Sequence, residues 1–364
     1  MSAYFSAMKA VGGVLAAIGL TLGGLGSVSA QDVTRLRISM HQSSASPEVE
    51  QIIRPLKEFI ETRSGGKLKV EVYPNAALHG AAEGFKALVT DVTDLTPTYP
   101  IYQSRSFGFN HVSSMPMAFP NAYVGARVNE ELYGAFYKPE WDKIGVYPLF
   151  YPVTATYDIL STKEIKSLAD LKGMKIRGGG DTLNRIIESL GASPITVPSP
   201  EVYMAFQQGV VDAVLFNTAS ILSFRLDEIG KYYMPLGLSR VGIPWSVNPK
   251  TFQALSPDLQ KVIFDAGREG SILYSDYVTR DTGAAVEAMR KRGIAFVELS
   301  AEELQTVREA ITPMWDDFIE KNGPQARELV TALRQKVEGY GDMDRETFVR
   351  LQHEEPVKAM WPGR

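Results

Sequence analysis

The segment ADLKGMKIRGGGDTLNRIIESLGA, residues 169–192, places Arg177 directly before three glycines and the beginning of a predicted helix. A guanidinium is always charged and offers a rigid pair of donors that match the two oxygens of a carboxylate or phosphate. The glycines leave room for an anion, and the positive amino end of the helix points toward the same space. The alternative is a structural ion pair with a nearby acid, Asp181 or Asp212.

The elements around Arg177 alternate between strand and helix. MKIR (174–177) predicts a strand, Asp181 is expected to cap a helix over 182–190, and VVDAVLF (210–216) predicts a buried strand with Asn217 at its carboxyl end. Ligands of open α/β sheets bind beyond the carboxyl ends of the strands. We therefore expect Arg177 and Asn217 to face one cleft.

Further candidates also lie next to strand ends or strand-like runs. The tyrosines of TYPIYQSRSF could stack on a ligand or cover a sheet edge, and Phe216 could form an apolar wall or belong to the core. His41 could equally be a solvent-facing or capping histidine. The predicted ligand-binding residues are Arg177, Asn217, Phe216, Tyr99, Tyr102, His41, Gln42, Thr156, Tyr157 and Trp245.

Catalytic patterns find little support. Residues 178–180 do not fit the spacing of a dinucleotide or phosphate loop, and no GxSxG segment is present. The acidic pairs are adjacent residues on predicted helices, so they point in different directions and cannot flank a substrate. The histidines show no metal-type spacing; they are His41, His79, His111 and His353. The sequence predicts no cofactor, no metal site and no enzyme activity.

Composition narrows the class of protein. The chain has 364 residues, 45% hydrophobic and 22% charged, which is enough for two cores in a soluble globular protein. The net charge is −4, and no basic run is interleaved with aromatic residues, so nucleic acid is not an expected partner. Cysteine is absent, which excludes disulfides, thiolate metal sites, a cysteine nucleophile and a cysteine-linked lipid anchor.

The first thirty residues predict a cleavable secretory signal. Lys9 is their only charged residue, an uncharged run follows, and Val28-Ser29-Ala30 supplies small residues before Gln31. A retained membrane anchor is the alternative, although the glycines in the run and the lack of a following stop-transfer cluster favour cleavage. Export of a chain without cysteine predicts the bacterial periplasm, with a mature chain that begins at Gln31.

The remaining elements predict an α/β protein. RLRISM (35–40), a helix over 47–66 with a possible kink at Pro55, and KLKVEVYP (67–74) form a βαβ unit. Ser167 with Asp170, and Ser300 with Glu303, form capping-box patterns. A run of about 36 residues from Pro257 to Gly293 predicts an unusually long helix, which could bend or break at Gly267, Gly270 or Gly283.

Several segments resemble one family across nearly the whole mature chain. They are SLADLKGMKIR, LGASPITVPSPEVYMAFQQGVVDAVLFN, KLKVEVYPNAALHG, TDLTPTYPIY and MPMAFPNA. In this order they are similar to the DctP-like solute-binding proteins of tripartite ATP-independent periplasmic (TRAP) transporters. Ala213 stands where that family usually has glycine, and VLFNTAS lacks the common ENP ending. Matching Asn217 to the family's ligand-binding asparagine therefore needs a shift of one residue.

The resemblance implies a receptor that captures a small organic acid and delivers it to the TRAP membrane subunits, with Arg177 as the carboxylate-binding residue. It implies a two-lobed periplasmic binding protein fold with a cleft between the lobes and a long helix spanning both. Lobe one would cover residues 31–152 and 242–282, and lobe two residues 153–241 and 283–364. The rival hypothesis is a secreted α/β hydrolase or lyase acting on a small carboxylate. A basic or sugar ligand is disfavoured by Arg177.

Overall fold

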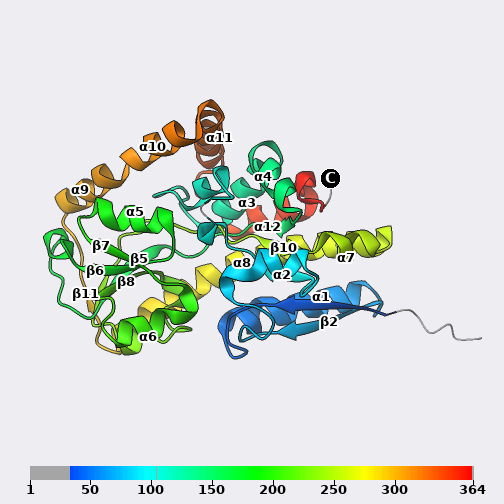
Figure 1. The fold of residues 1–364 in the computed structure, drawn as a ribbon, viewed down its shortest axis with the longest axis horizontal. Helices are drawn as coiled ribbons and strands as arrows, with labels where there is room; N and C mark the ends of the chain where they lie inside the picture. Colours follow the sequence, from blue (N-terminus) through cyan, green and yellow to red (C-terminus); the bar gives the residue numbers. More distant parts are fainter. Residues whose placement is uncertain (1–32, 104, 363–364) are drawn as a thin grey trace, which may run out of the picture. The chain divides into compact units, whose positions relative to one another are not determined.

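The computed structural model describes residues 33–103 and 105–362 (Figure 1). The predicted signal segment, residues 1–30, and the predicted new terminus at Gln31 lie outside the described residues. Within the described ranges, no helix has both the length and the apolar character needed to cross a membrane.

The first sheet contains the predicted βαβ unit. Strands β1 and β2 are parallel, with Thr34 opposite Leu68, and β3 continues the parallel pairing on the other side of β1. Strand β10 returns from much later in the chain and runs antiparallel to both β3 and β4. The strand order is β2 (Leu68–Tyr73), β1 (Thr34–Ser39), β3 (Leu95–Pro97), β10 (Trp245–Val247) and β4 (Tyr147–Phe150).

The predicted helix after β1 has two parts. It begins as a π-helical turn, Val49–Ile53, and continues as α1 (Arg54–Arg63). Pro55 lies in the first turn of α1, where its missing N–H removes one bond of the regular ladder. The expected irregularity at Pro55 is therefore a change of helix type just before it.

The second sheet carries Arg177 and Asn217. Strand β6 is parallel to both β7 and β8, so the carboxyl ends of β6 and β8 meet at one edge, as expected. Strand β5 is antiparallel to β8 and pairs Tyr157 with Asn217, which brings the amino end of β5 to that same edge. The strand order is β11 (Ala295–Phe296), β9 (Tyr232–Met234), β5 (Tyr157–Ser161), β8 (Ala213–Asn217), β6 (Lys175–Gly178) and β7 (Ser193–Thr196).

The chain crosses between the two sheets in neighbouring extended segments. Val153 and Gly242 form an antiparallel bridge, in which the Thr154 amide donates to the Val241 carbonyl (2.9 Å) and the Ile243 amide to the Pro152 carbonyl (2.9 Å). Gly242 is required here because a Cβ atom would lie 2.5 Å from the Ser113 hydroxyl.

Helix α8, Pro257–Lys291, forms a third connection and is one continuous helix of 35 residues. Figure 1 shows it passing from the first sheet to the second. The expected break points do not interrupt it: a Cβ atom at Gly267 would lie 2.6 Å from the Leu149 carbonyl oxygen, so this glycine allows close packing against β4. Tyr274 belongs to the large core cluster that includes residues of both sheets, and Met289 belongs to a smaller cluster on one face of the second sheet.

Capping explains where several elements begin. Both expected capping boxes, Ser167 with Asp170 and Ser300 with Glu303, are present. The expected cap at Asp181 is wrong. Asp181 is the first residue of α5 (Asp181–Ser189), and the capping position is Gly180. A Cβ atom at Gly180 would lie 2.4 Å from the Ile101 carbonyl oxygen, so only glycine fits between this helix and the loop after β3.

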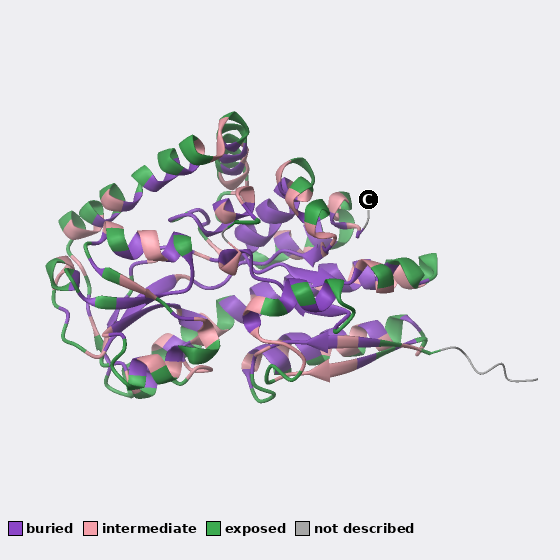
Figure 2. Ribbon diagram, in the orientation of Figure 1, coloured by how far each residue is buried: buried purple, intermediate pink, exposed green. Residues whose placement is uncertain are grey.

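The remaining helices cover the sheets, and Figure 2 shows their exposed faces in green around the buried strands. Near the carboxyl terminus, Gln352 on α12 donates to Glu130 on α3 (2.9 Å), and Glu130 forms a buried ion pair with Arg268 on α8 (2.8 Å). The helices that cover the sheets are α2 (Gly84–Val89), α3 (Ala122–Leu132), α4 (Lys138–Ile144), α6 (Val202–Gln207), α7 (Pro249–Ala254), α9 (Ala301–Ile311), α10 (Pro313–Asn322), α11 (Pro324–Tyr340) and α12 (Arg345–Glu354).

The division of the chain into lobes stays a prediction.

Candidate ligand-binding cavity

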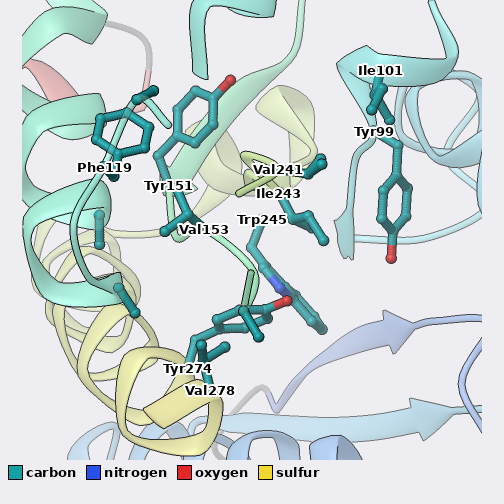
Figure 3. Close-up of a cluster of buried hydrophobic side chains, with 14 of the residues drawn as sticks. Tyr99, Ile101, Phe119, Tyr151, Val153, Val241, Ile243, Trp245, Tyr274 and Val278 are labelled. Atoms are coloured by element: carbon teal, nitrogen blue, oxygen red, sulfur yellow. The ribbon is translucent and has the colours of Figure 1, made fainter. Parts of the chain in front are cut away.

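A cavity lies where the loops of the first sheet face the strand ends of the second. The space between its atoms is about 520 Å³, including the part that is open to solvent. The first sheet contributes the loops after β1 and β3, the second contributes β5, β6 and β8, and α8 contributes Tyr274. Figure 3 shows Tyr99, Ile101, Val241, Ile243 and Tyr274 in the buried cluster beside this cavity.

Arg177 is the cation of this cavity. Only 1% of the residue is exposed, and its guanidinium donates to the carbonyls of Val197 (Nε, 2.8 Å) and Leu215 (Nη1, 3.4 Å) and to the Ser199 hydroxyl (Nη2, 3.3 Å). The guanidinium carbon lies 5.2 Å from the centre of the Phe216 ring. These contacts fix the side chain without neutralising its charge.

The alternative of an ion pair with a nearby acid is not found. Asp212 pairs with Lys163 instead (2.8 Å), and no carboxylate among the described residues forms an ion pair with Arg177. Gly179 lies against the guanidinium, where a Cβ atom would be 3.1 Å from Nη2. A larger residue at this position would press on the guanidinium and crowd the space in front of it.

Aromatic side chains form much of the wall. Phe224 packs edge-on against Phe216 with ring centres 5.1 Å apart, and Tyr99 lies 5.6 Å from His41 and 5.5 Å from Tyr102. Phe216 is both a core residue, 1% exposed, and part of the cavity lining, so the two interpretations of this residue are compatible. Such a wall suits a flat, largely apolar ligand.

Asn217 is held by its neighbours at the end of β8. Its side-chain oxygen accepts a hydrogen bond from the Ser220 amide (3.2 Å). Burial raises the pKa of Tyr157 well above its usual value, and a side-chain hydrogen bond with Asn217 opposes that shift. Asn217 is therefore positioned before any ligand is bound.

One side-chain contact bridges the two sides of the cavity. The Tyr102 hydroxyl, from the loop after β3, lies 3.2 Å from the Ser199 hydroxyl, from the turn after β7. Ser199 in turn accepts a hydrogen bond from Arg177 (3.3 Å). The loop of the first sheet is thus linked through Ser199 to the cation of the second.

Two ionisable residues on the first-sheet side have shifted pKa values. Burial lowers the pKa of His41 to about 4, with a smaller contribution from His79, so His41 is neutral at pH 7. Burial raises the pKa of Glu48 to about 7, and a hydrogen bond with Gln42 partly opposes the shift.

Eight of the ten predicted ligand-binding residues line this cavity. Their contacts with a ligand stay predictions. They are Arg177, Asn217, Phe216, Tyr99, Tyr102, His41, Gln42 and Tyr157.

The structure does not place Thr156 and Trp245 among the lining residues. The Thr156 hydroxyl donates to Asp158 (3.0 Å), since adjacent side chains of an extended chain point in opposite directions and Tyr157 takes the cavity side. Trp245 is fully buried in β10 and stacks on Phe150 with ring centres 5.7 Å apart.

Sequence reasoning missed more than half of the lining. Ser199 follows the end of β7, so the strand-end rule could have found it, whereas Glu48 and Tyr274 belong to helical segments without any local signal. The missed lining residues are Glu48, Ile101, Thr154, Gly179, Leu183, Ser199, Ser220, Phe224, Val241, Ile243 and Tyr274.

Among residues 33–103 and 105–362, no group of three His, Asp or Glu side chains is arranged to hold a metal ion.

Comparison with known proteins identifies the class. Residues 38–322 match the family model of DctP, the bacterial extracellular solute-binding proteins of family 7, and the chain belongs to this family. A solute-binding protein of Albidiferax ferrireducens is 26% identical over 302 residues, 78% of this chain and 85% of the relative. The C4-dicarboxylate-binding periplasmic protein DctP of Rhodobacter capsulatus is 24% identical over 279 residues, 76% of this chain and 84% of the relative.

Solved structures share the fold. A TRAP solute-binding protein of Rhodoferax ferrireducens, in complex with copurified benzoate, superposes with a TM-score of 0.79 at 22% identity, covering 85% of this chain and 98% of the other. A marine metagenome protein specific for aromatic acid ligands, in complex with 3-hydroxybenzoate, gives 0.78 at 22% identity, covering 85% and 99%. The predicted two-lobed α/β binding-protein fold is confirmed, and the chain is an extracellular solute-binding protein of the DctP family.

Proposed function

We propose that this receptor captures a small organic acid in the bacterial periplasm and delivers it, chemically unchanged, to the membrane subunits of a TRAP transporter. In this proposal Arg177 binds the ligand carboxylate through paired hydrogen bonds, Asn217 adds a neutral contact, and the aromatic wall encloses the body of the acid.

The observation that carries the proposal is the state of Arg177. A buried charge is costly unless it is paired, yet this guanidinium has only neutral partners among the described residues and lines the cavity. A ligand carboxylate would complete the pair. The benzoate and 3-hydroxybenzoate bound by the two structural relatives support an acid that fits an aromatic wall.

Native mass spectrometry of the protein purified from its own host or from a bacterial lysate tests this proposal. We expect a co-purified species that is released on denaturation and identified as a carboxylic acid. Incubating the protein with that acid should return the acid unchanged, because the proposed role includes no reaction. A co-purified amine or uncharged sugar would contradict the carboxylate, and a converted product would favour the hydrolase or lyase hypothesis.

Export is part of the same proposal. Expressed with its native first thirty residues in a bacterium, the protein should accumulate in the periplasm with Gln31 as its first residue, which amino-terminal sequencing determines. Soluble protein that still begins with Met1 would contradict cleavage of a signal segment.

A further inference from the structure

The cavity holds an acid as well as a cation. Glu48 lies just before the π-helical turn that follows β1, is 7% exposed, and lines the cavity. No basic side chain among the described residues forms an ion pair with it. Its hydrogen-bond partner is Gln42, whose own side-chain oxygen is buried and has no donor.

Gln42 therefore presents a buried acceptor that lacks a donor. Its side-chain oxygen has no hydrogen-bond partner, and Gln42 and Glu48 line the same cavity. A buried acceptor without a donor destabilises the protein, and a donor on a ligand would remove that cost.

Glu48 and Arg177 belong to different sides of the cavity. Glu48 comes from the first-sheet side and Arg177 from β6 of the second sheet. A run of contacts connects them along one wall. Glu48 acts electrostatically on Tyr99, the Tyr99 ring packs on Tyr102, and the Tyr102 hydroxyl reaches Ser199 beside the guanidinium.

A ligand that fills this cavity meets opposite requirements at its two ends. Near Arg177 a carboxylate is favoured by charge and by the geometry of the guanidinium. Near Glu48 a second carboxylate would oppose a buried acid and compete for the same donors, because like charges in a desolvated site repel strongly. A neutral hydroxyl or N–H group would instead donate to Glu48 or Gln42.

We propose, on the basis of the function proposed above, that Gln42 and Glu48 select a monocarboxylic acid carrying a hydroxyl or N–H donor at the end remote from its carboxylate, and reject dicarboxylic acids.

Matched series of acids test this selectivity by calorimetric titration at pH 8, where the carboxyl group of Glu48, with a pKa of about 7, is mostly ionised. One series is benzoate, 3-hydroxybenzoate and isophthalate, and the other is butanoate, 4-hydroxybutanoate and succinate. In at least one series we expect the hydroxy acid to bind at least tenfold more tightly than the plain acid, and the dicarboxylate at least tenfold more weakly than the plain acid.

The variant Glu48→Gln keeps the size of the side chain but supplies a donor and no charge. Compared with the parent, we expect the ratio of the affinity for the dicarboxylate to the affinity for the plain acid to rise at least tenfold. We also expect the preference for the hydroxy acid over the plain acid to fall. Glu50→Gln is the matched control, since Glu50 lies two residues away, pairs with Arg54 and does not line the cavity. It should bind all the acids as the parent does.

The outcomes separate this inference from the function on which it rests. The selectivity assigned to Gln42 and Glu48 would be overturned if the parent protein bound the three acids of each series with affinities that agree within threefold. It would also be overturned if the hydroxy acids failed to bind in both series. Equal changes for all acids in Glu48→Gln would do the same. Loss of all acid binding in Arg177→Ala, alongside any of these results, would leave the carboxylate receptor intact, whereas unchanged binding in Arg177→Ala would overturn the receptor function itself.

Discussion

Two buried charged residues face the cavity without an ion-pair partner among the described residues. Arg177 and Glu48 contrast with Glu130 and Arg268, which are equally buried but pair at 2.8 Å and join α3 to α8. A paired buried charge is a structural feature, whereas an unpaired one in a cavity imposes a cost that a ligand can relieve. We therefore propose that the first two residues bind a ligand, whereas the second two stabilise the fold.

The pH dependence of stability follows from Glu48. Its pKa is raised from 4.5 to about 7, so folding favours the protonated form. The resulting stabilisation is present below pH 4.5 and is lost as the pH rises through about 7, by about 3 kcal/mol in total. We expect the free energy of unfolding of the empty parent to fall by about this amount, relative to Glu48→Gln, between pH 4.5 and 8.

Urea unfolding at several pH values measures this difference. His41 acts in the opposite direction, because its pKa is lowered to about 4 and its contribution is lost as the pH falls from about 6.5. Subtracting the Glu48→Gln curve from that of the parent removes the His41 contribution. A difference that is constant across the range would show that Glu48 is solvated in the folded protein.

At the scale of elements, features that depend on local sequence signals were predicted better than features that depend on the pairing of distant segments. The capping boxes at Ser167 and Ser300 and the strand that carries Arg177 depend on a few neighbouring residues, and all are present, although this strand ends one residue later, at Gly178. The placement of Trp245 in the core depends on β10 pairing with β3 and β4, which are distant in sequence. The contribution of Tyr274 likewise depends on how α8 packs, which periodicity alone does not specify.

Gly267 and Gly270 of α8 were likewise not understood from local sequence. The sequence suggested that the helix could bend there, whereas the structure shows close packing. Gly267→Ala would force a Cβ atom to 2.6 Å from the Leu149 carbonyl oxygen, so we expect a loss of about 1 to 3 kcal/mol in the free energy of unfolding. Gly283→Ala is the matched control in the same helix. Its Cβ would meet no atom within 4 Å, so the better helix propensity of alanine should stabilise the protein by about 0.5 to 1 kcal/mol.

Chemical denaturation of the two alanine variants distinguishes these effects. Opposite signs support packing of α8 against β4 at Gly267. A stabilising effect of Gly267→Ala would contradict that packing and favour a bend in the helix at this residue.

At the scale of the whole molecule, the cavity depends on both sheets and on the segments that connect them. The antiparallel bridge between Val153 and Gly242 and the continuous helix α8 are suited to a hinge, and the contact between Tyr102 and Ser199 links the two sides of the cavity. We expect the receptor to become more compact when its acid binds. Small-angle scattering should give a smaller radius of gyration at saturating ligand, and an unchanged radius would contradict closure.

Family membership follows from extended similarity, but the ligand does not. Arg177 and the strand ends were predictable because they depend on local pattern and on the direction of parallel strands. Glu48 was not, because it shares the cavity with Tyr99 and Tyr274, which lie far from it in the sequence. Selectivity within the family therefore depends on residues that only the folded structure brings together.

We propose that Arg177 binds the carboxylate, and calorimetric titration of Arg177→Ala with the acid that co-purifies measures its contribution. Breaking a buried charge pair from one side costs about 3 to 5 kcal/mol, or about two to four orders of magnitude in Kd. Arg177→Lys keeps the charge without the paired donors and should bind more weakly than the parent but more tightly than the alanine variant. Asn217→Ala should lose only about 1 to 2 kcal/mol.

Arg185→Ala provides the control, because Arg185 lies on α5 in an exposed ion pair with Asp317 and does not line the cavity. It should bind the acid as the parent does, and the melting temperature of every variant reports whether it is folded. We expect at least a hundredfold loss of affinity in folded Arg177→Ala. Binding within threefold of the parent would show that Arg177 is structural and that the carboxylate lies elsewhere.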